Sequence, residues 1–173
     1  MADLYRPFTW DDLGDVELGR ENLGLEMPVI VYRLFEYTTK DVLARRYGVE
    51  AAKEIIRECG HLAGRHFYKN VLFEEGQSFD DFVARLQRSL KDFKIGVLRL
   101  EFVDLAKKEL TLVVSEDLDC SGMSVSDEAV CNYDEGFIAG ILESFTGETW
   151  HVREIDCWAT GDRVCRFEAK GGK

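Results

Sequence analysis

Three cysteines and one glutamate in the C-terminal third of the chain have side chains and spacing that suit a metal ion. They are Cys131, Glu154, Cys157 and Cys165, in the pattern Cys-x22-Glu-x2-Cys-x7-Cys. Thiolate sulfur and carboxylate oxygen are ligands that a tetrahedral Zn²⁺ accepts. Four protein ligands leave no open position for an activated water, so zinc here is expected to be structural. Taken one at a time, the same cysteines are equally consistent with small buried apolar side chains.

The predicted elements around these residues bring them together. Segments 150–158 and 163–169 are expected to form a hairpin that turns at Thr160-Gly161-Asp162, which places Cys157 beside Cys165. Glu154 precedes Cys157 by three residues, and on a regular strand the two side chains would point to opposite faces. A bulge or the start of the turn must therefore intervene if both bind one ion. Cys131 is expected in the first turns of a helix, where the helix dipole lowers a thiol pKa.

The remaining pattern predicts an α+β fold, with helices packed on a twisted antiparallel sheet. Apolar residues at three- and four-residue steps predict the helices, and alternating ones predict an earlier hairpin. The helices are expected over 29–48, 49–68, 78–92 and 127–144, and the earlier hairpin over 95–103 and 109–115. Residues 1–28 are interpreted as an N-terminal extension packed on the domain, with a strand or two. Residues 29–173 are interpreted as one ligand-binding domain, with Cys59 in its core and Cys120 in a polar loop.

Composition excludes several classes of function. The net charge of −11 argues against binding to nucleic acid or to an anionic membrane surface, because both need clustered Lys and Arg. No apolar run reaches membrane-spanning length, and the N-terminus lacks the pattern of a signal peptide. We therefore expect a cytoplasmic protein. In a reducing compartment, five cysteines are more often metal ligands, redox groups or buried thiols than disulfides.

The C-terminal block resembles the 4-vinyl reductase domain family, most specifically from Cys131 onward. The residues that carry the resemblance are Cys131, Gly136, Phe137, Gly140, Glu154, Cys157, Gly161-Asp162, Cys165 and Phe167. The cysteine and glutamate spacing is similar to the zinc site of the sensor domains of phenol- and xylene-responsive transcriptional activators. The resemblance implies a fold similar to haem-nitric-oxide-binding domains and vesicle-tethering subunits. It also implies a homodimer with a zinc ion beside a hydrophobic pocket, and Cys131, Glu154, Cys157 and Cys165 as the zinc ligands.

A sensor-type domain that binds an apolar or aromatic ligand and signals to a regulatory partner is the first functional hypothesis. Eleven Phe residues suit an apolar cavity, and Tyr32, Tyr37, Tyr68 and Arg33 are candidates for its polar contacts. The aromatic-effector pocket of the activators uses a His and a Trp ahead of the first cysteine. No tryptophan stands between Trp10 and Trp150 here, so a specificity for phenol does not carry over.

Two other hypotheses remain open. One is a tetrapyrrole-binding or vinyl-reductase-associated protein of (bacterio)chlorophyll-type metabolism, with His61 or His66 as a conceivable haem ligand. The sequence shows no nicotinamide, flavin or nucleotide fingerprint, so catalysis is the weaker expectation and no catalytic residue is assigned. The other hypothesis is an assembly module with a filled interior. His61 and His66 are otherwise expected on the surface, and His151 is a candidate to support the metal ligands.

Overall fold

A four-stranded antiparallel sheet in the order β1-β2-β4-β3 forms one layer of the molecule. The computed structural model describes residues 6–172. The strands are β1 (Val97–Asp104), β2 (Glu109–Ser115), β3 (Trp150–Asp156) and β4 (Cys165–Gly171). Both predicted hairpins are present, as β1–β2 and β3–β4, and β4 joins them by pairing with β2. The α+β prediction is therefore confirmed.

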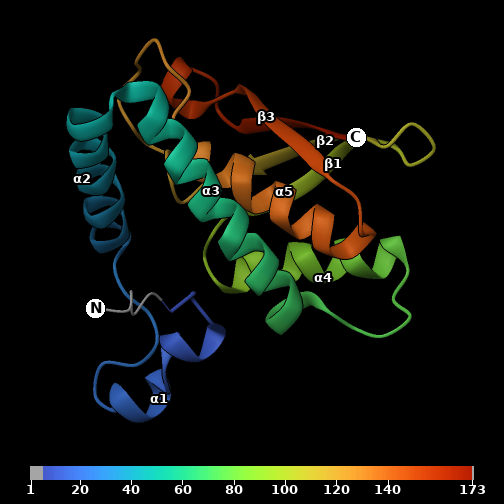
Figure 1. Ribbon diagram of the computed structural model, residues 1–173, viewed down its shortest axis with the longest axis horizontal. Coiled ribbons are helices and arrows are strands. Elements are labelled where there is room, and N and C mark those ends of the chain that lie inside the picture. The colour runs from blue at the N-terminus through green and yellow to red at the C-terminus, as the bar shows by residue number, and fades with distance from the viewer. Residues whose placement is uncertain (1–5, 173) are drawn as a thin grey trace.

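Helices α3 and α5 lie in front of the sheet, and α2 stands apart at the edge of the molecule (Figure 1). The helices are α1 (Val16–Gly19), α2 (Val29–Tyr47), α3 (Val49–Phe67), α4 (Phe79–Asp92) and α5 (Asn132–Thr146), with short helical turns η1 (Trp10–Leu13), η2 (Tyr68–Leu72) and η3 (Trp158–Thr160). Local chemistry sets several of these ends. Pro28 precedes α2, Gly48 separates α2 from α3, and Ser78 caps α4 in a capping box with Asp81.

Two pairs of glycines let α3 and α5 cross at backbone contact. A Cβ atom added to Gly136 would lie 1.9 Å from the Arg57 carbonyl oxygen, and one added to Gly140 would lie 2.2 Å from the His61 carbonyl oxygen. Gly60 makes the reciprocal approach, since its Cβ would lie 2.0 Å from the Tyr133 carbonyl oxygen. Only glycine permits such an approach without displacing the backbone. The crossing fixes the start of α5 relative to the rest of the core.

Two glutamates of α5 tie strand β3 to helix α3. Glu135 accepts the Glu154 amide proton through Oε1 at 3.0 Å, and its Oε2 pairs with the Arg57 guanidinium at 2.8 Å. Glu143 repeats the arrangement with the Trp150 amide at 3.1 Å and the His61 ring at 2.7 Å. His61 is thus the hydrogen-bonded surface histidine that the sequence predicts. The backbone amides at both ends of β3 are satisfied by side chains from one helix.

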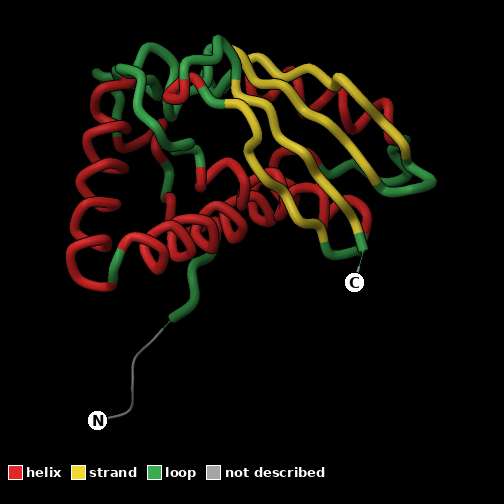
Figure 2. The backbone as a smooth tube through the Cα atoms, turned by 90° about the horizontal axis from the view of Figure 1, so that it is seen from above, coloured by secondary structure: helices red, strands yellow, loops and turns green. Residues whose placement is uncertain are grey.

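Helix α2 lies at one end of the molecule, away from the strands (Figure 2). It packs against α3. Its outward face carries large apolar side chains, including Ile30, Leu34 and Phe35, which are 70%, 64% and 72% exposed. Phe35 and Phe102 were both expected in the core but are exposed, because the elements that carry them each leave one face without a covering neighbour. None of the helices within residues 6–172 is long and apolar enough to cross a membrane.

Three local predictions differ from the structure. Residues 6–28 form helical turns instead of strands, because Asp12 and Asp15 accept hydrogen bonds from the amides of Thr9 and Leu18. Residues 1–5 lie outside the described part. Helix α5 begins at Asn132 and not near residue 127, since the preceding segment is held against the β3–β4 turn by the Ser126 amide and the Ala159 carbonyl. Cys59 is exposed on α3 and does not join the core.

Candidate metal centre

Four cysteine thiols meet in the interior where the start of α5 faces the β3–β4 hairpin. Cys120, Cys131, Cys157 and Cys165 are all 0% exposed, and their sulfur atoms lie within 4.8 Å of one another. Cys131 immediately precedes α5, Cys157 follows β3, and Cys165 begins β4. The three predicted cysteines therefore do converge. The fourth, Cys120, comes from the loop between β2 and α5, where the sequence predicts only an ordinary loop residue.

The sulfur separations suit a tetrahedral ion for the three predicted cysteines. Cys131 Sγ lies 3.8 Å from both Cys157 Sγ and Cys165 Sγ. A tetrahedron of zinc–sulfur bonds about 2.3 Å long has edges of about 3.8 Å. Cys120 Sγ is closer, at 3.1 Å from Cys165 Sγ, which is shorter than such an edge. It is also far longer than the sulfur–sulfur bond of about 2.05 Å in a disulfide.

Glu154 lies beside the thiols, at an irregularity of strand β3. The β3–β4 register shifts between Glu154 and Asp156, so the bulge that the three-residue spacing required is present. The side chain is 7% exposed, and its Oε2 accepts the Cys131 amide proton at 3.2 Å. Its Oε1 is buried and has no hydrogen-bond partner among the described residues. An unsatisfied buried carboxylate oxygen is costly, and a cation would remove that cost.

The protein alone stabilises one thiolate well, and it does so at Cys157. Hydrogen bonds from the thiol of Cys120, and then from those of Cys131 and Cys165, lower the pKa of Cys157. The pKa of Cys131 is raised, first by its contact with Cys120. The expectation that the helix dipole makes Cys131 the thiolate is therefore wrong, because neighbouring sulfurs outweigh it. Burial, followed by the charge of Cys157, raises the pKa of Glu154 to about 8.

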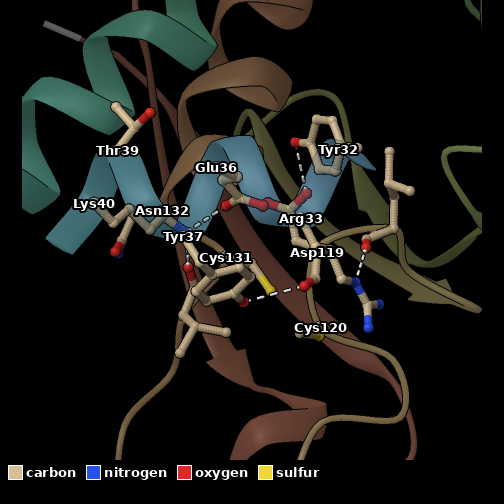
Figure 3. Close-up of polar contacts among 12 residues, drawn as sticks. Tyr32, Arg33, Glu36, Tyr37, Thr39, Lys40, Asp119, Cys120, Cys131 and Asn132 are labelled. Atoms are coloured by element: carbon tan, nitrogen blue, oxygen red, sulfur yellow. Dashed lines mark hydrogen bonds and ion pairs between the residues drawn. The ribbon is translucent and has the colours of Figure 1, made fainter. Parts of the chain in front are cut away.

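Helix α2 holds the loop that carries Cys120 (Figure 3). Tyr32 donates its hydroxyl proton to Asp119 Oδ1 at 2.9 Å, and Arg33 donates to the Leu118 carbonyl at 2.7 Å. Tyr37 donates to the Asp119 carbonyl at 3.1 Å. These contacts explain why Cys120 is buried, and they join residues more than eighty positions apart.

Lys40, one turn further along α2, donates to the Val130 carbonyl at 2.8 Å, next to Cys131. Helix α2 thus contacts the chain beside two of the four thiols. His151, predicted to support the metal ligands, is exposed on β3 instead, and its ring makes no contact that would orient a ligand within residues 6–172. Arg166 pairs with Glu101 and Asp156, which takes its charge away from the sulfurs.

A cavity of about 410 Å³ opens between the N-terminal segment, α3, α5 and the loops before β1 and before Cys120. Most of its wall is aromatic, and the residues that line it include Trp10, Tyr32, His66, Phe67, Phe93 and Phe137. This volume lies in the range of small-molecule sites. Among the polar candidates named from sequence, Tyr32 lines the cavity, whereas Tyr37 and Arg33 bind the loop beneath it. Tyr68 packs in the core against Phe82.

Residues 110–171 match the family model of the 4-vinyl reductase domain, which agrees with the resemblance seen in the sequence. The uncharacterized protein MJ1642 of Methanocaldococcus jannaschii is 23% identical over 150 residues, which is 87% of this chain and 81% of that protein. A vinyl-4-reductase family protein from Methanocaldococcus jannaschii superposes with a TM-score of 0.63 at 18% identity, covering 100% of this chain and 99% of the other.

Three further solved structures share the fold. The phenol-responsive sensory domain of the transcription activator PoxR, solved with phenol, has a TM-score of 0.68 at 15% identity and covers 86% of this chain and 76% of its own. A trafficking protein particle complex subunit 3 from Naegleria fowleri, covalently bound to palmitic acid, has a TM-score of 0.66 at 14% identity, with 84% and 95% covered. An H-NOX protein of T. Tengcongensis has a TM-score of 0.53 at 16% identity, with 94% and 91% covered. The predicted similarity to haem-nitric-oxide-binding and vesicle-tethering folds is confirmed.

Proposed function

Because this chain carries a 4-vinyl reductase domain, we propose that it is a sensor-type domain that binds an apolar or aromatic small molecule and is stapled by a structural zinc ion. The observation that carries the proposal is the pairing of two sites along one loop. Cys120 belongs to the buried thiols, and its neighbour Asp119 lines the aromatic cavity. A metal that fixes this loop also fixes one wall of the cavity. Ligand and metal are thereby expected to stabilise each other.

The proposed zinc ligands are Cys131, Glu154, Cys157 and Cys165. The tetrahedral edge lengths of the three sulfurs support this set, as does the unsatisfied Glu154 Oε1. Cys120 is the competing donor, since its sulfur also lies among the other three. Either set provides four protein ligands, so the ion would be structural and would polarise no water.

Helix α2 is the proposed route for a signal. It touches the loop beside Cys120 and the residue before Cys131, and it turns Ile30, Leu34 and Phe35 toward solvent. Exposed apolar faces of this kind mark interaction surfaces. We assign the α2 face to a homodimer contact that a regulatory partner reads, in the reducing cytoplasm where thiols stay available to metal. Replacing Phe35 with Asp should convert the dimer to a monomer in light scattering, and Glu58→Gln on exposed α3 should not.

Native mass spectrometry of the purified full chain tests the proposal in one measurement. We expect one zinc ion per chain, a dimer, and retained small-molecule mass that is lost on mild activation. A metal-free chain with full thermal stability would overturn the structural role of zinc. A chain that binds none of a panel of apolar and aromatic compounds would overturn the sensor role.

Tetrapyrrole binding is the second candidate function, and His66 is the observation that favours it. His66 lines the cavity, with its ring 5.0 Å from that of Phe8. An imidazole at a cavity wall is a suitable axial ligand for haem iron. Titration with haem should then produce a shifted, sharpened absorption band that His66→Ala abolishes. An unchanged spectrum would leave only the sensor hypothesis.

A further inference from the structure

Two acidic side chains in the wall of the aromatic cavity have buried oxygens that the described chain leaves unsatisfied. Asp119 is 2% exposed, and while its Oδ1 accepts from Tyr32, its Oδ2 has no partner among residues 6–172. Asp134 Oδ2 is likewise buried and unpartnered in that part of the chain. Both residues line the cavity. Buried carboxyl groups are normally satisfied, so these two oxygens require a donor.

The opposite side of the cavity offers aromatic rings. Phe67 packs 5.3 Å from Phe137 and 5.5 Å from Phe93, and Tyr133 stacks on Phe137 at 6.2 Å. All four rings line the cavity. Aromatic faces carry negative charge density and attract organic cations. The wall therefore suits a ligand that is apolar over most of its surface and positively charged at one end.

The bases nearest to Asp119 are already engaged elsewhere. Arg33 donates to the backbone carbonyls of Leu118 and Ser121, and Lys40 pairs with the buried Glu36. Within the described residues, the cavity lining contains neither lysine nor arginine, and its one basic ring, His66, packs against Phe8. The carboxyl groups therefore lack a compensating cation from the protein, and uncompensated buried charge is strongly unfavourable.

We propose that the cavity binds an organic amine, whose ammonium group donates to Asp119 Oδ2 and Asp134 Oδ2 while its apolar body lies against Phe67, Phe93 and Phe137. The inference rests on the proposed function, in which this cavity is the ligand site, and it adds the charge and headgroup of the ligand. Ammonium groups carry several donors and no acceptor, which matches two unsatisfied acceptors. Charge-assisted hydrogen bonds of this kind are the strong ones.

Calorimetric titration of the zinc-loaded full chain at pH 7 tests the proposal with two probes of nearly equal shape. The probes are 2-phenylethylamine, which is cationic at this pH, and 2-phenylethanol, which is neutral. We expect the amine to bind at least about tenfold more tightly, because hydrogen bonds to a charged group contribute about 1.5–3 kcal/mol. Asp119→Asn keeps an oxygen for Tyr32 and should abolish this preference. The matched control Asp80→Asn, on the exposed side of α4, should preserve it.

The outcomes separate this inference from the function on which it rests. If the alcohol binds as tightly as the amine, the amine proposal is overturned and the ligand cavity stands. If neither probe binds, the ligand site itself falls. If Asp119→Asn retains its fold and its amine preference, the headgroup does not lie at Asp119. Should that variant fail to fold, the amine-to-alcohol ratio of the unaltered chain still decides the matter.

Discussion

Cys131 Sγ lies 3.8 Å from Cys157 Sγ, although one residue precedes helix α5 and the other follows strand β3. Four buried thiols at such distances leave the metal-free protein with several sulfurs that lack a good partner. An ion at their centre would connect the start of α5 to the terminal hairpin. Metal binding and folding of this region are therefore expected to be one event.

Replacing Cys157 with Ser should remove the metal and loosen the hairpin. We expect loss of bound zinc and a fall of several kcal/mol in the free energy of unfolding, because structural zinc contributes directly to folding. Elemental analysis and chemical denaturation measure both. Cys59→Ser, which changes the exposed thiol on α3, is the matched control and should alter neither quantity. Full zinc content in Cys157→Ser would contradict the proposed centre.

The identity of the fourth ligand is tested by a pair of variants. Glu154→Gln removes the carboxylate charge with little change in shape, and Cys120→Ser removes the competing sulfur. If Glu154 is the ligand, Glu154→Gln should weaken zinc affinity by about tenfold or more, whereas Cys120→Ser should retain it. Competition against a coloured chelator gives both affinities. The reverse result would assign the fourth position to Cys120.

A methyl group at the α3–α5 crossing should be strongly destabilising. The Cβ of Gly136→Ala would lie 1.9 Å from the Arg57 carbonyl oxygen, so the helices must separate. We expect a loss of at least about 2 kcal/mol, in the range of overpacked cores. Gly19→Ala is the control, because no neighbouring atom lies within 4 Å of its added Cβ. Urea denaturation compares the two, and equal midpoints would show that the crossing relaxes freely.

The stability of the metal-free protein should fall as pH rises from about 4.5 to 8. Burial, and then the charge of Cys157, raises the pKa of Glu154 from its ordinary 4.5 to about 8. Across this window the folded carboxyl retains a proton that the unfolded chain has released, so unfolding becomes easier with pH. One such group contributes at most about 1.4 kcal/mol per pH unit.

Thermal denaturation of chelator-treated protein between pH 4.5 and 8 measures this slope. Asp119, whose pKa burial raises to about 8, contributes in the same direction. Glu154→Gln should therefore flatten the slope without removing it. Zinc affinity should show the opposite trend and increase with pH, because the ligands must lose their protons to bind. A rising stability of the metal-free chain over this range would contradict the protonated state of the buried carboxyls.

Much of the local architecture could be predicted from the residues alone. Apolar periodicity indicates the helices from Val29 and Val49, the Ser78 capping box marks the start of α4, and the Thr160–Asp162 turn pairs Cys157 with Cys165. The bulge beside Glu154 also followed from sequence, because two ligands three residues apart cannot share a face of a regular strand. These features depend on residues that are near one another in the chain.

The tertiary structure decided what the chain alone left open. Cys120 looked like a loop residue, and its burial depends on hydrogen bonds from α2 to a loop more than eighty residues away. The acidic wall of the cavity arises in the same way, since Asp119 and Asp134 meet aromatic rings from α3 and α5 only after these helices cross at their glycines. Sequence spacing encodes contacts within a turn, a helix or a hairpin. Contacts between distant segments depend on how whole surfaces pack, and no local pattern records that choice.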